Sequence, residues 1–86
     1  MSKFDKLILK LLSGNSDKNF DFNDLLLLLE RVGFKMRTKG SHHIFYKEDV
    51  EEIINLQPQS NKVKPYQLKQ VREILIKYKL IQPDAT

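Results

Sequence analysis

The feature that most limits how this chain can fold is a change of hydrophobic period at Gly33. Before Gly33, residues such as Leu25, Leu28 and Val32 recur every three or four positions, which is the spacing of one apolar face of an α-helix. In residues 34–39, apolar or neutral side chains alternate with basic ones, which is the period of a strand with one face toward water. The chain therefore predicts a helix and then a strand, with glycine as the left-handed cap between them.

The remaining segments extend this pattern into an α+β order. Gly40 suits a tight hairpin turn, Pro58 ends a strand, and Pro65 suits the first turn of a helix. The expected elements are helices at residues 3–12, 23–32 and 65–79 and strands at residues 34–39, 42–47 and 52–56. We expect an α-β-β-β-α fold with an extra N-terminal helix, in which helices cover one face of a three-stranded antiparallel sheet.

The apolar stripes also predict the core. Its expected members are Leu25, Leu28, Leu29, Val32, Phe34, Met36, Leu68, Val71 and Leu75. Leu26 and Leu27 fall outside the stripe of their helix, so the N-terminal helix or a partner protein must cover them. A chain of 86 residues has room for one such core, which predicts a single domain.

Charge favours a polyanionic partner. Fifteen Lys and Arg stand against eleven Asp and Glu, and no acidic residue interrupts the basic runs at residues 31–39 and 60–72. The chain has no cysteine, which excludes disulfides and thiolate chemistry. Its longest apolar run, residues 25–29, is far shorter than the about 18 residues that a membrane span needs. We therefore expect a soluble, cytoplasmic protein with no membrane partner.

The chain places its two histidines side by side, at His42 and His43, directly after Gly40 and Ser41. Consecutive side chains of a strand point to opposite faces, so the pair cannot act together on one phosphate. There is no third histidine or cysteine to complete a metal site, and Ser41 lacks the surroundings of a hydrolase nucleophile. What remains is one histidine that transfers a proton on a polyanion, or one that only binds phosphate.

The segment GSHHIF at residues 40–45, preceded by Val32-Gly33-Phe34 and followed by the basic helix that Pro65 opens, resembles the HicA family of toxin ribonucleases. The resemblance covers residues 21–80, with residues 1–20 as an added helix and connector and residues 81–86 as a frayed tail. It implies a double-stranded-RNA-binding-like fold and a metal-independent endoribonuclease, without cofactor, that cleaves mRNA. It also implies a HicB-type antitoxin that covers the active site, with DNA contacted only through that antitoxin.

The same resemblance assigns roles to individual residues. The family pattern Gly-Ser-X-His makes His43 catalytic and leaves His42 at a variable position. The expected substrate-binding residues are Lys39, Gly40, Ser41, Phe45, Lys62 and Lys64. Phe45 shares the face of His43, where it either stacks on a base or packs against the histidine ring. A second acid or base stays open among Lys39, Lys62, Lys64 and Tyr46.

Two other functions stay open at this point. One is a non-catalytic module that binds double-stranded RNA by its shape, and the other is a protein-interaction module. A binding module has no need for a histidine at the mouth of a hairpin, whereas a cleaving enzyme needs a proton carrier there.

Overall fold

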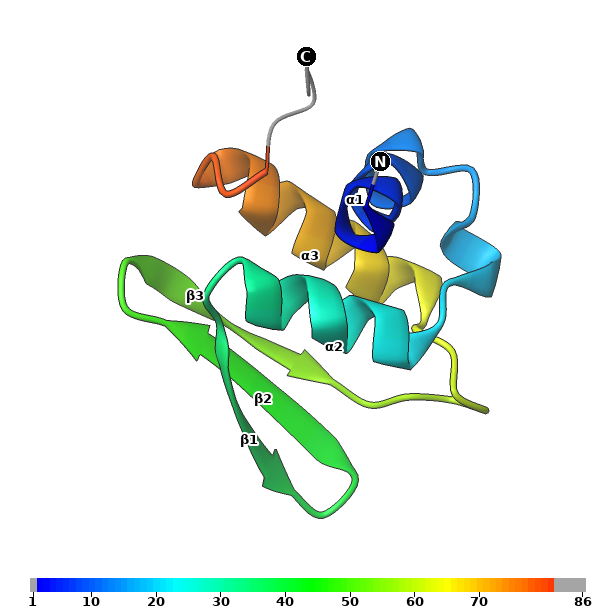
Figure 1. The fold of residues 1–86 in the computed structure, drawn as a ribbon. Coiled ribbons are helices and arrows are strands. Elements are labelled where there is room, and N and C mark those ends of the chain that lie inside the picture. The colour runs from blue at the N-terminus through cyan, green and yellow to red at the C-terminus, as the bar shows by residue number, and fades with distance from the viewer. Residues whose placement is uncertain (1, 82–86) are drawn as a thin grey trace.

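Two helices cover one face of a three-stranded sheet, and a third helix lies over them on the side away from the strands (Figure 1). The computed structural model describes residues 2–81. Its elements are α1 (Lys3–Ser13), the 3-10 turn η1 (Asp17–Asn19), α2 (Phe22–Arg31), β1 (Lys35–Lys39), β2 (His42–Lys47), β3 (Val50–Leu56) and α3 (Pro65–Lys77). The strands are antiparallel in the order β1-β2-β3, which confirms the predicted α+β fold and its α-β-β-β-α order.

Glycine ends α2 as the sequence predicts. Gly33 has a φ of 105°, and the N–H groups of Gly33 and Phe34 donate to the carbonyls of Glu30 and Leu29. This pair of bonds is a Schellman cap, in which the left-handed residue lets the chain leave the helix while the last carbonyls keep partners. The cap turns the chain directly into β1.

Most of the predicted core is buried, but Met36 is not. Leu25, Leu28 and Leu68 are fully enclosed, whereas Val32 is half-buried and Met36 is 46% exposed. The core also takes in residues that the prediction left out, among them Leu11, Phe20, Phe22, Phe45, Ile54 and Leu56. Met36 was predicted wrongly because β1 is an edge strand whose five residues are all exposed. Met36 pairs with the buried Phe45 of β2, so its exposure follows from its place on the edge strand.

The N-terminal helix packs against α2 and α3. Leu26 and Leu27 are both half-buried and pack against the core. Leu26 lines a hollow with Phe34, Met36 and Phe45, on the side of α2 that faces β1. α1 therefore completes the helix layer. Leu26, however, lies beside residues of the sheet and of the turn that leads into it, and not beside α1 in this hollow.

The chain after α3 returns to the core. Lys79 has a φ of 56°, and the N–H groups of Lys79 and Leu80 donate to the carbonyls of Ile76 and Leu75 in a second Schellman cap. This turn buries Ile81, which is only 4% exposed although the sequence places it at the start of a frayed tail. The rest of that predicted tail, residues 82–86, lies outside the described residues.

Candidate active site

His43 points toward the helix layer, near the beginning of α2. It lies on β2 opposite Thr38 of β1 and Leu56 of β3. Its ring packs against that of Phe22, the first residue of α2, with the centroids 4.8 Å apart and an angle of 67° between the planes. This edge-on arrangement is one of the two that aromatic rings prefer. Because Phe22 is only 6% exposed, the histidine rests on a rigid support.

The two nitrogens of the His43 ring differ in access. Nδ1 is buried and has no hydrogen-bond partner within residues 2–81. Of the two ring nitrogens, only Nδ1 is both buried and without a partner, which leaves Nε2, on the opposite edge, as the nitrogen open to a ligand. No carboxylate within the described part of the chain orients the ring through Nδ1, so packing against Phe22 takes the place of such a bond. Any proton transfer to a ligand must use Nε2.

His42 points to the opposite side of the sheet. Its Nδ1 lies 3.1 Å from Oδ1 of Asn55, and the side chain is exposed. Asn55 pairs with Ile44, which shares the face of His42 because the two are separated by one residue on β2. The predicted separation of the two histidines onto opposite faces is therefore confirmed.

The hairpin tip carries the Gly-Ser pair. Gly40 has a φ of 63°, and a Cβ at this position has no neighbour within 4 Å, so the glycine serves the left-handed turn and leaves open space beside it. Ser41 is exposed, and its Oγ accepts a hydrogen bond of 3.1 Å from Nε2 of Gln57. This bond ties the tip of the hairpin to the chain that leaves β3. The tip is therefore held against the end of β3.

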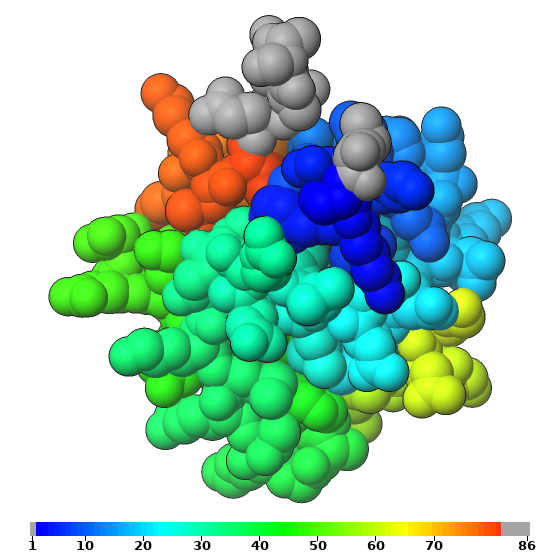
Figure 2. Space-filling view, viewed as in Figure 1, coloured from blue at the N-terminus to red at the C-terminus, as the bar shows by residue number. Residues whose placement is uncertain are grey.

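The loop before α3 lies against the beginning of α2. The N–H of Phe22 donates to the carbonyl of Asn61, and the N–H of Val63 donates to the carbonyl of Phe20, both at 2.9 Å. Figure 2 shows the result, with the yellow residues that lead into α3 beside the cyan start of α2. Residues far apart in sequence thus meet around Phe22, whose ring contacts His43 and whose N–H bonds the residue before Lys62.

Lys62 is held by an ion pair with Asp21, the N-cap residue of α2. The hydrogen bond and charge of Lys62 lower the pKa of the Asp21 carboxyl below its usual value. Asp21 makes no capping bond to its own helix. Lys62 and Lys64, together with Lys18, surround a hollow of about 270 Å³ at the start of α3. The hollow therefore presents positive charge from Lys18 and Lys64, which suits phosphate groups, while the charge of Lys62 is paired with Asp21.

Two of the residues expected to bind substrate lie elsewhere. Phe45 does share the face of His43, but it is 2% exposed and part of the core, so it cannot stack on a base. Lys39 pairs with His42 across the hairpin and shares its face, which places the lysine on the side of the sheet away from the ring of His43. Of the expected binding residues, Gly40, Ser41, Lys62 and Lys64 remain candidates to surround His43.

A scan of residues 2–81 finds no group of three or more His, Cys, Asp or Glu side chains placed to hold a metal ion. No helix in this part of the chain is long and apolar enough to cross a membrane.

Comparison with known protein families identifies a match. The family model described as the HicA toxin of bacterial toxin-antitoxin systems matches residues 22–78. The chain belongs to the HicA toxin family. No curated protein and no solved structure matches it. The match begins at Phe22, so the HicA region includes α2, the sheet and α3 and excludes α1. As a member of this family, the chain is a toxin of a toxin-antitoxin system, and the family implies an antitoxin partner.

The sequence pointed to His43 but not to Phe22 or Gln57. Alternation in β2 shows that His43 faces the helices, but it does not show which helical side chain meets the ring. A phenylalanine directly before the predicted start of α2 at residue 23 was the available signal. For Gln57, nothing in the sequence indicates a contact with Ser41.

Proposed function

We propose that this HicA-family toxin is a metal-independent endoribonuclease that cleaves mRNA, with His43 as its catalytic residue. The observation that carries the proposal is the position of the His43 ring. One edge of the ring packs against Phe22, the buried nitrogen is Nδ1, which leaves Nε2 for a ligand, and the strand that carries His43 begins directly after the Gly-Ser tip. An imidazole placed next to phosphate-binding groups can take or give a proton at neutral pH.

The chemistry that suits one histidine is transesterification within the RNA. The ribose 2′-oxygen attacks the adjacent phosphorus, the bond from phosphorus to the 5′-oxygen breaks, and the products are a 2′,3′-cyclic phosphate and a 5′-hydroxyl. The proton of the 2′-hydroxyl goes to a base, and the leaving 5′-oxygen gains one from an acid. Nε2 of His43 carries out one of these transfers, which is worth about 10² to 10⁴ in rate.

The loop lysines supply charge for this reaction. Lys62 and Lys64 lie beside the start of α2, close to the residue that supports His43, whereas Lys39 and Tyr46 lie on the opposite face of the sheet. Positive groups near the scissile phosphate stabilise the negative charge that develops in the transition state. We therefore place the phosphate between the hairpin tip at Ser41 and the loop of Lys62.

The antitoxin that fits this surface is a HicB-type protein that covers His43. An acidic or occluding partner would neutralise the basic loop and block Nε2 together, and it would account for any contact with DNA. In this proposal toxin, antitoxin and mRNA meet in the cytoplasm. Added salt should speed dissociation of the complex, because exposed charges across an interface are screened.

The test is cleavage of a labelled RNA in the presence of chelator, with identification of the ends. The wild-type chain should leave 2′,3′-cyclic phosphate ends, and His43→Ala should lose activity by about 10² to 10⁴ while it keeps its circular dichroism spectrum. His42→Ala is the matched control, because it removes the same side chain from the neighbouring position and should lose much less. RNA that is bound but not cut by the wild-type chain would instead indicate a non-catalytic binding module. Activity that depends on His42 and not on His43 would reverse the assignment.

A further inference from the structure

The outer face of the sheet, away from the helices, carries a regular arrangement that the His43 site does not use. The register pairs Lys35 with Tyr46, Arg37 with Ile44 and Lys39 with His42. Residues directly opposite each other in an antiparallel pair share a face, so each pair places a cation beside a ring or a branched apolar side chain. We call these six residues the outer track.

The spacing along the outer track is even. Alternate residues of a strand are about 7 Å apart, because each residue advances the strand by about 3.4 Å. That interval resembles the distance between successive phosphates of an extended single strand of nucleic acid. Three cations on β1 can therefore follow three phosphates while the neighbouring row on β2 lies under the bases.

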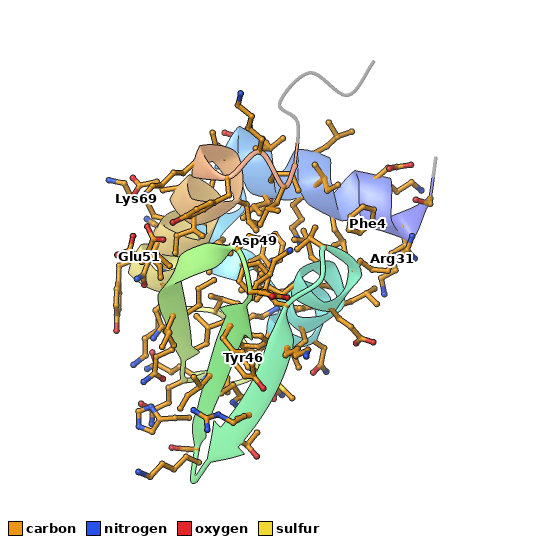
Figure 3. The ribbon with its side chains drawn as sticks, turned by 90° about the vertical axis from the view of Figure 1, so that its left-hand side faces the viewer. Phe4, Arg31, Tyr46, Asp49, Glu51 and Lys69 are labelled. Atoms are coloured by element: carbon orange, nitrogen blue, oxygen red, sulfur yellow. The ribbon has the colours of Figure 1, made fainter. Side chains whose placement is uncertain are left out.

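The surface of the outer track is open and basic. All three cations are exposed, and residues 31–47 contain no acidic side chain. Tyr46 is 37% exposed, and the Arg37 guanidinium lies 5.7 Å from the centre of its ring. Figure 3 shows Tyr46 on the strands, apart from Phe4 and Lys69 on the helices. The face thus offers both charge and an aromatic surface to a ligand.

A hollow of about 470 Å³ lies at the end of the outer track nearest the hairpin tip. Lys39, Gly40, His42, Ile44 and Asn55 line it. The His42 and Asn55 side chains bring hydrogen-bonding groups to its wall, 3.1 Å apart. His42, which lines the hollow, directly precedes His43 on β2, but the two side chains lie on opposite faces of the sheet. A strand that passes around the hairpin tip can therefore reach both the catalytic histidine and this hollow.

We propose that the outer track binds the single-stranded RNA that flanks the cleavage site, over about three nucleotides, with Tyr46 as a stacking surface. The inference rests on the proposed ribonuclease function and adds to it the path of the substrate. Nucleic-acid sites of this kind combine a basic groove with aromatic side chains on which bases stack. The main alternative, an acidic protein surface, fits less well, because protein interfaces exclude charge from their centres and three cations line the β1 side of this face, although β3 adds Glu51, Ile53 and Asn55 on its other side.

The test measures binding, not cleavage, and uses the full chain with His43→Ala so that the RNA stays intact. The ligand is a fluorescein-labelled 12-nucleotide RNA of mixed sequence, in parallel with a 12-base-pair RNA duplex. Tyr46→Ala should weaken binding of the single strand by about 5- to 140-fold. Tyr46→Phe, which keeps the ring, should restore it, and the duplex should bind both variants equally. A purely structural role for Tyr46 would not distinguish the single strand from the duplex.

Charge is tested by salt dependence. Arg37→Gln should lower the slope of log affinity against log salt by about 0.7, the value for one lost contact with a single-stranded phosphate. Lys6→Gln removes one exposed positive charge from α1, on the far side of the helix layer, and is the matched control. Equal slopes and affinities for Arg37→Gln, Tyr46→Ala and Lys6→Gln would overturn the proposal. The proposal would also be overturned if outer-track variants bound RNA normally but no longer bound the antitoxin. None of these measurements requires cleavage, so the result is independent of the cleavage test of His43.

Discussion

Replacing Phe22 by leucine tests whether packing holds the His43 ring in the orientation that the proposed catalysis needs. The change keeps an apolar side chain at the first turn of α2 but removes the aromatic edge contact with His43. An aromatic pair contributes about 0.5 to 1.5 kcal/mol beyond its area, and a near-isosteric core swap costs up to about 1.5 kcal/mol. The free energy of unfolding should therefore fall by about 0.5 to 3 kcal/mol. For a domain of this size, each kcal/mol lowers the Tm by about 4 to 8 °C.

The same contact energy sets the expected loss of activity. If the 0.5 to 1.5 kcal/mol favours the productive orientation of the ring, its removal lowers the population of that orientation by about 2- to 13-fold. The kcat should fall by that factor, far less than the about 10² to 10⁴ expected for His43→Ala. The KM should stay unchanged, because Phe22 is 6% exposed and out of reach of RNA.

Two measurements decide the matter. Thermal unfolding followed by circular dichroism gives the Tm, and single-turnover cleavage well below the Tm gives the rate at saturating protein. Leu28→Val is the matched control, since Leu28 is fully buried on the same helix. It should lower the stability by about 1 kcal/mol and leave cleavage unchanged. If Phe22→Leu also lowers the Tm without slowing cleavage, the ring does not depend on this contact and the reasoning is refuted.

Two further predictions concern stability. The Tyr78 hydroxyl, which donates to Glu52 at 2.6 Å, and the Lys77 ammonium lower the pKa of the Glu52 carboxyl from 4.5 to about 2. This contribution to stability is present above pH 4.5 and is lost as the pH falls toward 2. The Tm of Glu52→Gln should therefore lie below that of the wild type at pH 7 and converge with it near pH 2. A constant difference in Tm across this range would contradict the assignment. Arg72 of α3 donates to both carboxylate oxygens of Asp17 at 3.0 and 2.9 Å and to the carbonyl of Leu11 at 3.0 Å. Arg72→Met should lower the free energy of unfolding by about 2 to 4 kcal/mol in a urea titration, whereas a loss below about 0.5 kcal/mol would show that these bonds do not stabilise the attachment of α1.

Local patterns were enough to predict the elements and the separation of the two histidines. The helical stripe that ends at Gly33 and the alternation that follows it depend on the backbone geometry of a few neighbouring residues. The opposite directions of His42 and His43 follow from the same alternation. These features could be read from the sequence because each depends only on neighbours along the chain.

Tertiary structure decided which residues surround the histidine and which stay in water. Phe45 on the central strand entered the core, while its cross-strand partner Met36 remained exposed because β1 is an edge strand of the sheet. The loop of Lys62 reached α2 through backbone hydrogen bonds to Phe20 and Phe22, about 40 residues away in sequence. Periodicity says which face of an element is apolar, but how far one element overlaps another depends on the packing of the whole layer, to which distant segments contribute.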